Sequence, residues 1–319
     1  MSNYLNKEGI NVTEDHQLIR DILLSSVEEQ RKKRRWSIVL RLLFLVWLFI
    51  MLFSVLWSVD KQPSGSEYVA LVDIKGVIAD DRETNADTVT NGLKRAFADP
   101  KVQGVILRIN SPGGSPVQAG QIYDEIGRLK ATRPDLKVYA AITDTGASAA
   151  YYIAAAADQI YANRASVVGS IGAYMATFGF EQAMEKAGVA RRFYGSGDHK
   201  ALTDPFQPED PVAAAHLRAT VKNIHEQFIA RVKAGRKGRL TTEDKLFSGL
   251  IWTGEQALSL GLVDGLGSPG YLARELIGCE QIVDFTDKPS LIENVARTVG
   301  SHAALTLESH LGLNGWQVR

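Results

Sequence analysis

The longest apolar run of the chain lies near its amino-terminal end. Residues 36–57 read WSIVLRLLFLVWLFIMLFSVLW, with Arg41 as their only charge, and the basic run RKKRR stands directly before them. About 20 apolar residues form a helix about 30 Å long, which is the thickness of a bilayer core. Trp36 and Trp57 stand where interfacial tryptophans anchor such a helix, and the basic run favours a cytoplasmic amino-terminus. The pattern predicts one transmembrane helix at 36–57, with residues 1–35 in the cytoplasm.

A cleaved signal peptide is the competing interpretation of this segment. The charged leader is long for a signal peptide, and the residues that follow, SVDKQP, contain no small-residue cleavage site. We therefore expect a permanent anchor, with residues 58–67 as a linker to an extracytoplasmic domain at 68–285. Residues 286–319 form a carboxy-terminal tail to which the sequence assigns no role.

Beyond the linker, short runs of β-branched residues alternate with stretches of helical spacing. Strands are predicted at 68–79, 104–109, 137–143 and 159–162, and helices at 84–98, 116–130, 148–157, 180–187, 211–231 and 254–259. Strands and helices in alternation, joined by short loops, are typical of α/β folds with a parallel sheet covered on both faces. The sequence thus predicts an α/β domain.

Composition narrows the chemistry. The 319 residues carry a formal net charge of +0, so no global field favours nucleic acid as a partner. Cys279 is the only cysteine, which excludes an intrachain disulfide framework and a CxxC metal site. No cluster of metal ligands is recognisable in the sequence, and we expect neither a metal nor another cofactor.

Three loops carry candidate chemistry. NSPGGS (110–115) follows a predicted strand, and its glycines allow outward-pointing N–H groups that could bind an anion, although an ordinary turn has the same composition. Ser148 precedes an alanine-rich helix, where the N–H of Ala149 favours developing negative charge, although serine is also a common helix cap. GSGDHKALTDPF (195–206) contains His199 and Lys200, and lysines in such loops are usually exposed.

Two catalytic arrangements around Ser148 are open from the residues alone. His199 could complete a Ser-His-Asp triad with Asp144, Asp158 or Asp198. Lys200 could instead act as the base. The nucleophile elbow of α/β-hydrolases is disfavoured, because Ala150 stands where that motif has its second glycine.

Taken together, NSPGGS, TGASAAYYIAAAAD with VVGSIGA after it, and GSGDHKALTDPF resemble the bacterial signal peptide peptidase family of the protease IV type, in its short single-span form. The resemblance covers roughly residues 68–264. It implies a Clp-protease/crotonase-like fold of repeated β-β-α units and assembly as a homo-oligomer. It also implies a Ser–Lys dyad of Ser148 and Lys200, an oxyanion hole at the N–H groups of Gly114 and Ala149, and Ser170 as the hydroxyl that supports the lysine.

The expected function is that of a serine endopeptidase in the bacterial cytoplasmic membrane, which degrades cleaved signal peptides or other membrane-associated peptides on the extracytoplasmic side. Lysine serves as a base only when neutral, and burial favours that form, so we expect Lys200 to be buried within hydrogen-bond reach of Ser148. The alternatives are a SohB-like membrane peptidase with another substrate, a crotonase-like acyl-CoA enzyme, and a non-catalytic scaffold.

Overall fold

The computed structural model describes residues 31–51, 53 and 66–287, which fall into two units divided after Ser66. In the first unit, residues 31–51 and 53 are helical, and large apolar side chains such as Trp36 and Phe44 are exposed. Among the described residues, no helix combines the length and apolarity needed to cross a membrane. Residues 52 and 54–57 of the predicted span lie outside the described residues, as do 1–30, most of the linker and nearly all of the tail.

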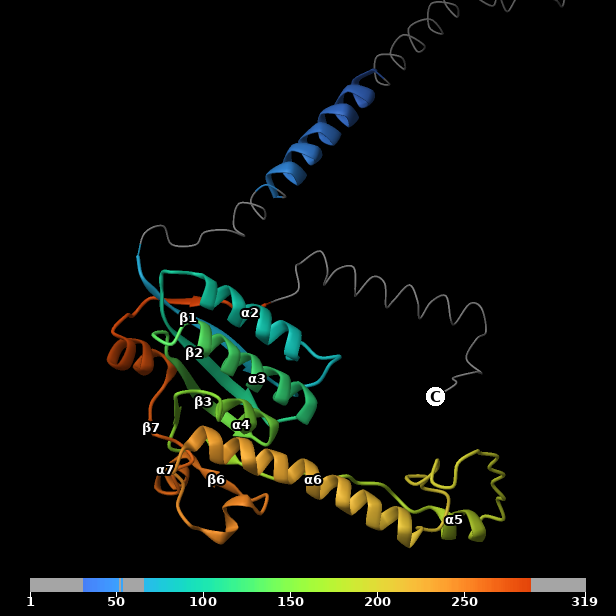
Figure 1. Cartoon of the computed structure of the whole chain (residues 1–319). Coiled ribbons are helices and arrows are strands. Elements are labelled where there is room, and N and C mark those ends of the chain that lie inside the picture. Colours follow the sequence, from blue (N-terminus) through green and yellow to red (C-terminus); the bar gives the residue numbers. More distant parts are fainter. Residues whose placement is uncertain (1–30, 52, 54–65, 288–319) are drawn as a thin grey trace, which may run out of the picture. The chain divides into compact units, whose positions relative to one another are not determined.

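The second unit is a mixed α/β fold built on one largely parallel sheet (Figure 1). Its strands run in the order β6-β5-β3-β2-β1-β8, with β4 paired to β3, and β7 paired to β4. All pairs are parallel except β5 with β6. The strands are β1 (Tyr68–Lys75), β2 (Val102–Ser111), β3 (Val138–Ala147), β4 (Gln159–Ala162), β5 (Val167–Gly169), β6 (Ile251–Thr253), β7 (Gly265–Leu266) and β8 (Ile282–Asp284). The predicted parallel α/β architecture is confirmed.

The helices begin where the sequence supplies caps. Asn85 forms a capping box with Thr88 before α2 (Ala86–Ala98), and Ser115 and Pro116 begin α3 (Pro116–Thr132). The helical elements that follow are α4 (Ala149–Ala154), α5 (Glu181–Lys186), α6 (Pro211–Arg236), the 3₁₀ turn η1 (Asp244–Phe247), α7 (Gly254–Ser259), α8 (Pro269–Tyr271) and the π-helical turn η2 (Leu272–Ile277).

The main core lies between the sheet and α2, α3 and α4. Fully buried members include Val72 and Leu107 from the strands, Ile122 from α3 and Ile153 from α4. A smaller cluster, with Ile106 on the sheet and Leu272 on η2, lies apart from this core. Because side chains of successive strand residues point to opposite faces, Ile106 and Leu107 belong to different clusters.

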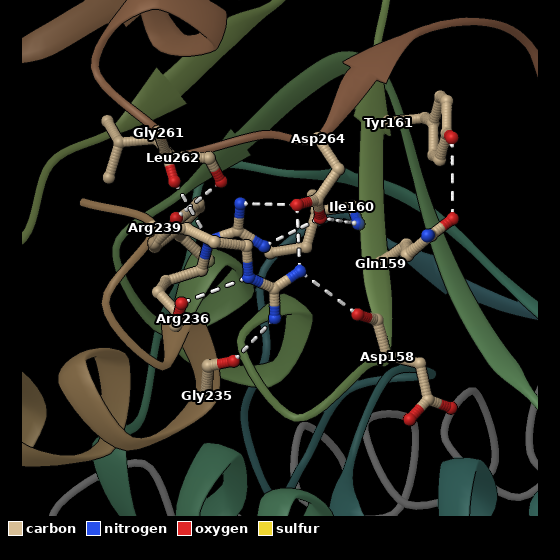
Figure 2. Close-up of polar contacts among 11 residues, drawn as sticks. Asp158, Gln159, Ile160, Tyr161, Gly235, Arg236, Arg239, Gly261, Leu262 and Asp264 are labelled. Atoms are coloured by element: carbon tan, nitrogen blue, oxygen red, sulfur yellow. Dashed lines mark hydrogen bonds and ion pairs between the residues drawn. The ribbon is translucent and has the colours of Figure 1, made fainter.

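The carboxyl-terminal half of α6 is joined to the sheet by a buried ion pair (Figure 2). Asp264 receives two hydrogen bonds from Arg236, at 2.7 and 2.9 Å, one from Arg239 at 2.7 Å, and one from the N–H of Ile160 at 2.7 Å. The Arg236 side chain is only 1% exposed. Burial alone raises the pKa of Asp264, but the hydrogen bonds from Arg236 and Ile160 outweigh it and hold the pKa below its usual value. The pair thus ties the last residue of α6 to β4 through Asp264.

We expect Asp264→Asn to lower the free energy of unfolding by about 3–5 kcal/mol at neutral pH, because it leaves the buried Arg236 cation without its counter-charge. The pKa of the Asp264 carboxyl is lower in the folded protein than in the unfolded chain. Its contribution to the free energy of unfolding is therefore present at neutral pH and is lost on acidification. The difference between variant and wild type should therefore shrink as the pH falls below about 3.9. Urea unfolding of both proteins at several pH values measures this difference in unfolding free energy.

Glu255→Gln is the matched control for this substitution. It removes the ion pair between Arg164 and Glu255, whose side chains are 72% and 66% exposed, and should cost no more than about 1 kcal/mol. Equal unfolding free energies for Asp264→Asn and wild type at pH 7, or a difference that grows on acidification, would contradict the assignment.

Candidate active site

Three loops meet at the carboxyl ends of adjacent parallel strands. β2 ends at Ser111, β3 ends at Ala147 and β5 ends at Gly169. Ser111 is paired with Gly146, and Ala147 with Gly169, so the three ends lie at one edge of the sheet. This edge is where open α/β sheets place their ligands. The predicted residues Gly114, Ser148, Ala149 and Ser170 all lie in the segments that follow these ends.

Ser148 occupies a strained turn between β3 and α4. Its backbone angles are φ 53° and ψ −126°, an unfavourable conformation for a residue with a side chain. The N–H of Ser148 donates to the carbonyl of Gly169 at 2.8 Å, and its own carbonyl accepts from Tyr152 at 3.0 Å. The half-buried side chain makes no capping hydrogen bond to α4. The interpretation of Ser148 as an ordinary helix cap is therefore wrong.

The loop after β2 lies directly against this turn. A Cβ atom added to Gly113, which has a φ of 105°, would lie 2.7 Å from Cβ of Ser148 and 2.9 Å from the nitrogen of Ala149. A side chain at this position would displace the serine. The sequence contained the relevant signal, the glycine pair of NSPGGS, but the contact with Ser148 depends on strand pairing and could not be read from the motif.

Two backbone N–H groups close to Ser148 in the chain or at the sheet edge, those of Gly114 and Ala149, donate no loop hydrogen bond within the described residues. Ile78 pairs with this loop through the carbonyl of Gly113 and the N–H of Ser115, and the N–H of Gly114 takes no part in this pairing. Ala149 is the first residue of α4, and N–H groups in the first turn of a helix lack an intrahelical acceptor. Both groups belong to segments in contact with Ser148, an arrangement that suits stabilisation of an oxyanion.

Ser170 follows Gly169 in a second strained turn. Its φ is 50°, and its N–H donates to the carbonyl of Leu250 at 2.8 Å. Ser170 directly follows Gly169, the residue whose carbonyl accepts the N–H of Ser148. Trp252, on β6 opposite Val168, packs against Gly169 and has a buried indole N–H without a hydrogen-bond partner among the described residues. No motif in the sequence pointed to Trp252.

Lys200 does not join this group within one chain. It lies in a turn of the arm, our name for residues 172–210, and is exposed. Figure 1 shows α5 and the arm's loops beside the amino-terminal end of α6, away from the sheet. No hydrogen bond links Lys200 to Ser148 in the described part of the chain. The expectation that Lys200 is buried beside Ser148 is thus not met in the single chain.

The alternative Ser-His-Asp triad is not assembled either. His199 is exposed, and its Nδ1 lies 3.4 Å from a carboxylate oxygen of Asp210. Asp144 accepts a hydrogen bond from Asn110, and Asp158 pairs with Lys130. Within the described ranges, none of the proposed carboxylates forms an ion pair with His199.

Gly113→Ala tests the close packing of this edge. We expect a loss of about 2–3 kcal/mol, or about 5–10 °C in Tm, because the methyl group meets the Ser148 turn and the residue must adopt a positive φ. Gly127→Ala on the exposed face of α3 is the control, since a Cβ there meets no atom within 4 Å. It should leave Tm unchanged or raise it slightly. Equal Tm values for the two variants would contradict this geometry.

Comparisons with known proteins point to one family. The model of "Peptidase family S49" matches residues 130–277. "Putative protease slr0021" of Synechocystis is 32% identical over 207 residues, which cover 65% of this chain and 72% of that protein. "Putative signal peptide peptidase SppA" of Enterococcus faecium is 30% identical over 215 residues, covering 65% of this chain and 62% of that protein.

Other similarities are narrower. A Brucella abortus protein named "Na(+)/H(+) antiporter NhaA" is 46% identical over 186 residues, but these are 58% of this chain and only a quarter (25%) of that protein's length. A solved structure of a mutant of the "1510-N membrane-bound stomatin-specific protease" has a TM-score of 0.42 and 19% identity, and its match covers 71% of this chain and 100% of that one.

Proposed function

The chain belongs to peptidase family S49, and from this premise we propose that it is a membrane-anchored serine endopeptidase of the signal peptide peptidase type. Ser148 is the nucleophile and Lys200 the general base. The catalytic domain, residues 68–285, has a Clp-protease/crotonase-like fold and is held by a helix at 36–57 on the extracytoplasmic side of the bacterial cytoplasmic membrane. Residues 58–67 link the two. Its substrates are cleaved signal peptides or other membrane-associated peptides.

One observation carries the catalytic part of this proposal. Ser148 has an unfavourable backbone conformation, and its hydroxyl makes no capping hydrogen bond to α4. Two glycine-containing loops pack around it. Strain of this kind persists only where the surrounding structure enforces it, and it concentrates at catalytic positions. A strand, a strained serine and a helix in succession also resemble the turn that exposes the nucleophile of other serine hydrolases, here without the second glycine of their motif.

The proposed reaction proceeds in two steps. The Ser148 hydroxyl attacks the peptide carbonyl carbon while the Lys200 amine takes its proton, and the N–H groups of Gly114 and Ala149 stabilise the oxyanion. The carbon–nitrogen bond then breaks, and Lys200 returns the proton to the departing amine. Lys200 then takes a proton from a water molecule, whose oxygen attacks the ester carbon. The bond between this carbon and the Ser148 oxygen breaks, and Lys200 returns the proton to Ser148. The Ser170 hydroxyl orients the lysine amine.

Assembly is part of the proposal, because the single chain leaves Lys200 exposed. The arm that carries it exposes several aromatic side chains, with Tyr174, Phe178 and Tyr194 at 90%, 75% and 89%. Several large exposed aromatic residues on one short segment are typical of a surface that another molecule covers. We infer that a second copy of the chain covers the arm and that the same contact buries Lys200 next to a Ser148 hydroxyl.

The anchor rests on the sequence. Residues 36–57 carry one charge among 22 positions and follow five consecutive basic residues. A peptidase held at the membrane surface meets apolar peptides where they concentrate, which suits the proposed substrates.

Ser148→Ala and Lys200→Ala should each lower the hydrolysis of a fluorogenic peptide by the full-length protein in detergent by about 1,000-fold or more, because the two residues act as one unit. The double variant should be no worse than either single variant, for the same reason. Rates at fixed protein concentration measure both effects.

Lys186→Ala is the matched control, since Lys186 is another exposed lysine of the same arm. It should retain wild-type activity. Full activity in either dyad variant, or an equal loss in Lys186→Ala, would refute the dyad.

A further inference from the structure

The arm and the first turns of α6 enclose a cavity of about 510 Å³. Its lining contains five carboxylates and no lysine or arginine among the described residues. The five are Glu181, Asp198, Asp204, Glu209 and Asp210. A cavity of this size lined by one sign of charge concentrates ligands of the opposite sign.

Two of these carboxylates each have a buried oxygen without a hydrogen-bond partner among the described residues. The Asp204 side chain is only 6% exposed, and its Oδ1 atom accepts from Arg191 and from the N–H of Phe206. Its Oδ2 atom and the Oε2 atom of Glu181 are buried without a hydrogen-bond partner in the described part of the chain. Buried polar atoms are almost always hydrogen-bonded, so both oxygens are suited to accept a hydrogen bond from a bound group.

The other acidic residues are already engaged or solvated. Asp210 caps α6 through the N–H of Val212 and lies 3.4 Å from His199. Glu209 faces Arg218 at 3.8 Å on the surface. The unpaired oxygens of the cavity are therefore those of Glu181 and Asp204, and a ligand would donate its hydrogen bonds there.

The remaining lining favours an organic cation. Phe178 and Phe193 contribute aromatic rings, which attract guanidinium and ammonium groups. The carboxylates do not converge as metal ligands: no group of three or more His, Cys, Asp or Glu side chains in the described ranges could hold a metal ion. A guanidinium is planar and carries five donors, so it could satisfy both unpaired oxygens.

We propose that this cavity binds a basic side chain, arginine above lysine, of the peptide substrate. This inference rests on the proposed peptidase function. Its location supports a peptide as the source, because His199 and Ala201, the two neighbours of Lys200, both line the cavity. A peptide engaged by the proposed base would therefore have this cavity within reach.

Binding of matched peptides to full-length Ser148→Ala protein in detergent tests the proposal, since this variant does not consume the probe. The probes are apolar fluorescent decapeptides with one arginine at successive positions, and a second set with citrulline, which has a similar shape but no charge. For at least one position, Kd should be about tenfold lower for arginine at low salt, a difference that salt weakens.

Adding Glu181→Gln should reduce this preference to less than threefold. Glu185→Gln is the matched control on the same helix, because Glu185 is exposed and does not line the cavity, and it should keep the preference. Equal Kd values for the two peptide sets at every position would overturn the proposal. So would a Glu181→Gln protein that changes its oligomeric state but keeps the arginine preference, since the cavity would then hold a cation of a neighbouring copy.

Hydrolysis by the wild-type protein separates the two hypotheses. Cleavage of the citrulline and arginine peptides at equal rates, without a difference in Kd, would reject the cavity proposal and leave the peptidase intact. An arginine preference in binding without hydrolysis of any peptide would reject the peptidase function and leave a cavity that binds a basic side chain, but not that of a substrate.

Discussion

Parallel pairing of β2, β3 and β5 determines where the candidate catalytic loops begin. Each strand delivers one loop to the same edge of the sheet, and the hydrogen bond from the N–H of Ser148 to the carbonyl of Gly169 joins two of them. The third loop fits only because Gly113 has no side chain. The positive φ of Ser148 occurs at this crowded point, and a residue with a side chain rarely adopts such a conformation.

The arm depends on a second constraint, the attachment of α6. The pair of Arg236 with Asp264 holds the carboxyl-terminal end of α6 on the sheet, while its amino-terminal turns contact the arm. At 1.5 Å per residue, its 26 residues span about 39 Å, so the arm is carried away from the sheet. Lys200 thus belongs to a part of the molecule whose large apolar side chains are exposed in the single chain, which is the observation behind the proposed oligomer.

Much of this fold could be predicted from the sequence, because strands and helices are specified by local periodicity. The strand at 159–162 and the helix at 254–259 agree with prediction to the residue. The first strand ends at Lys75 rather than 79, since Gly76 turns the chain with a φ of 74°. The serine, the glycine pair and the residues of the proposed oxyanion hole were also recognisable, because each belongs to a single short loop.

Features that join distant segments were not predictable. The contact of Gly113 with Ser148 requires the register of β2 against β3, and the Arg236–Asp264 pair joins residues 28 positions apart. The acidic cavity combines α5, the loop around Asp204 and α6, none of which is unusual alone. The environment of Lys200 is harder still to predict from the sequence, since its burial would depend on contacts that one chain does not contain.

The central claim is that Ser148 is the nucleophile, and covalent labelling tests it most directly. The full-length protein in detergent is treated with a serine-directed acylating inhibitor until peptidase activity is lost, and the modified residue is then located by mass spectrometry. The account predicts modification of Ser148 in proportion to the loss of activity, and no modification in Lys200→Ala. Inactivation with the label on any other residue, and with Ser148 unmodified, would contradict it.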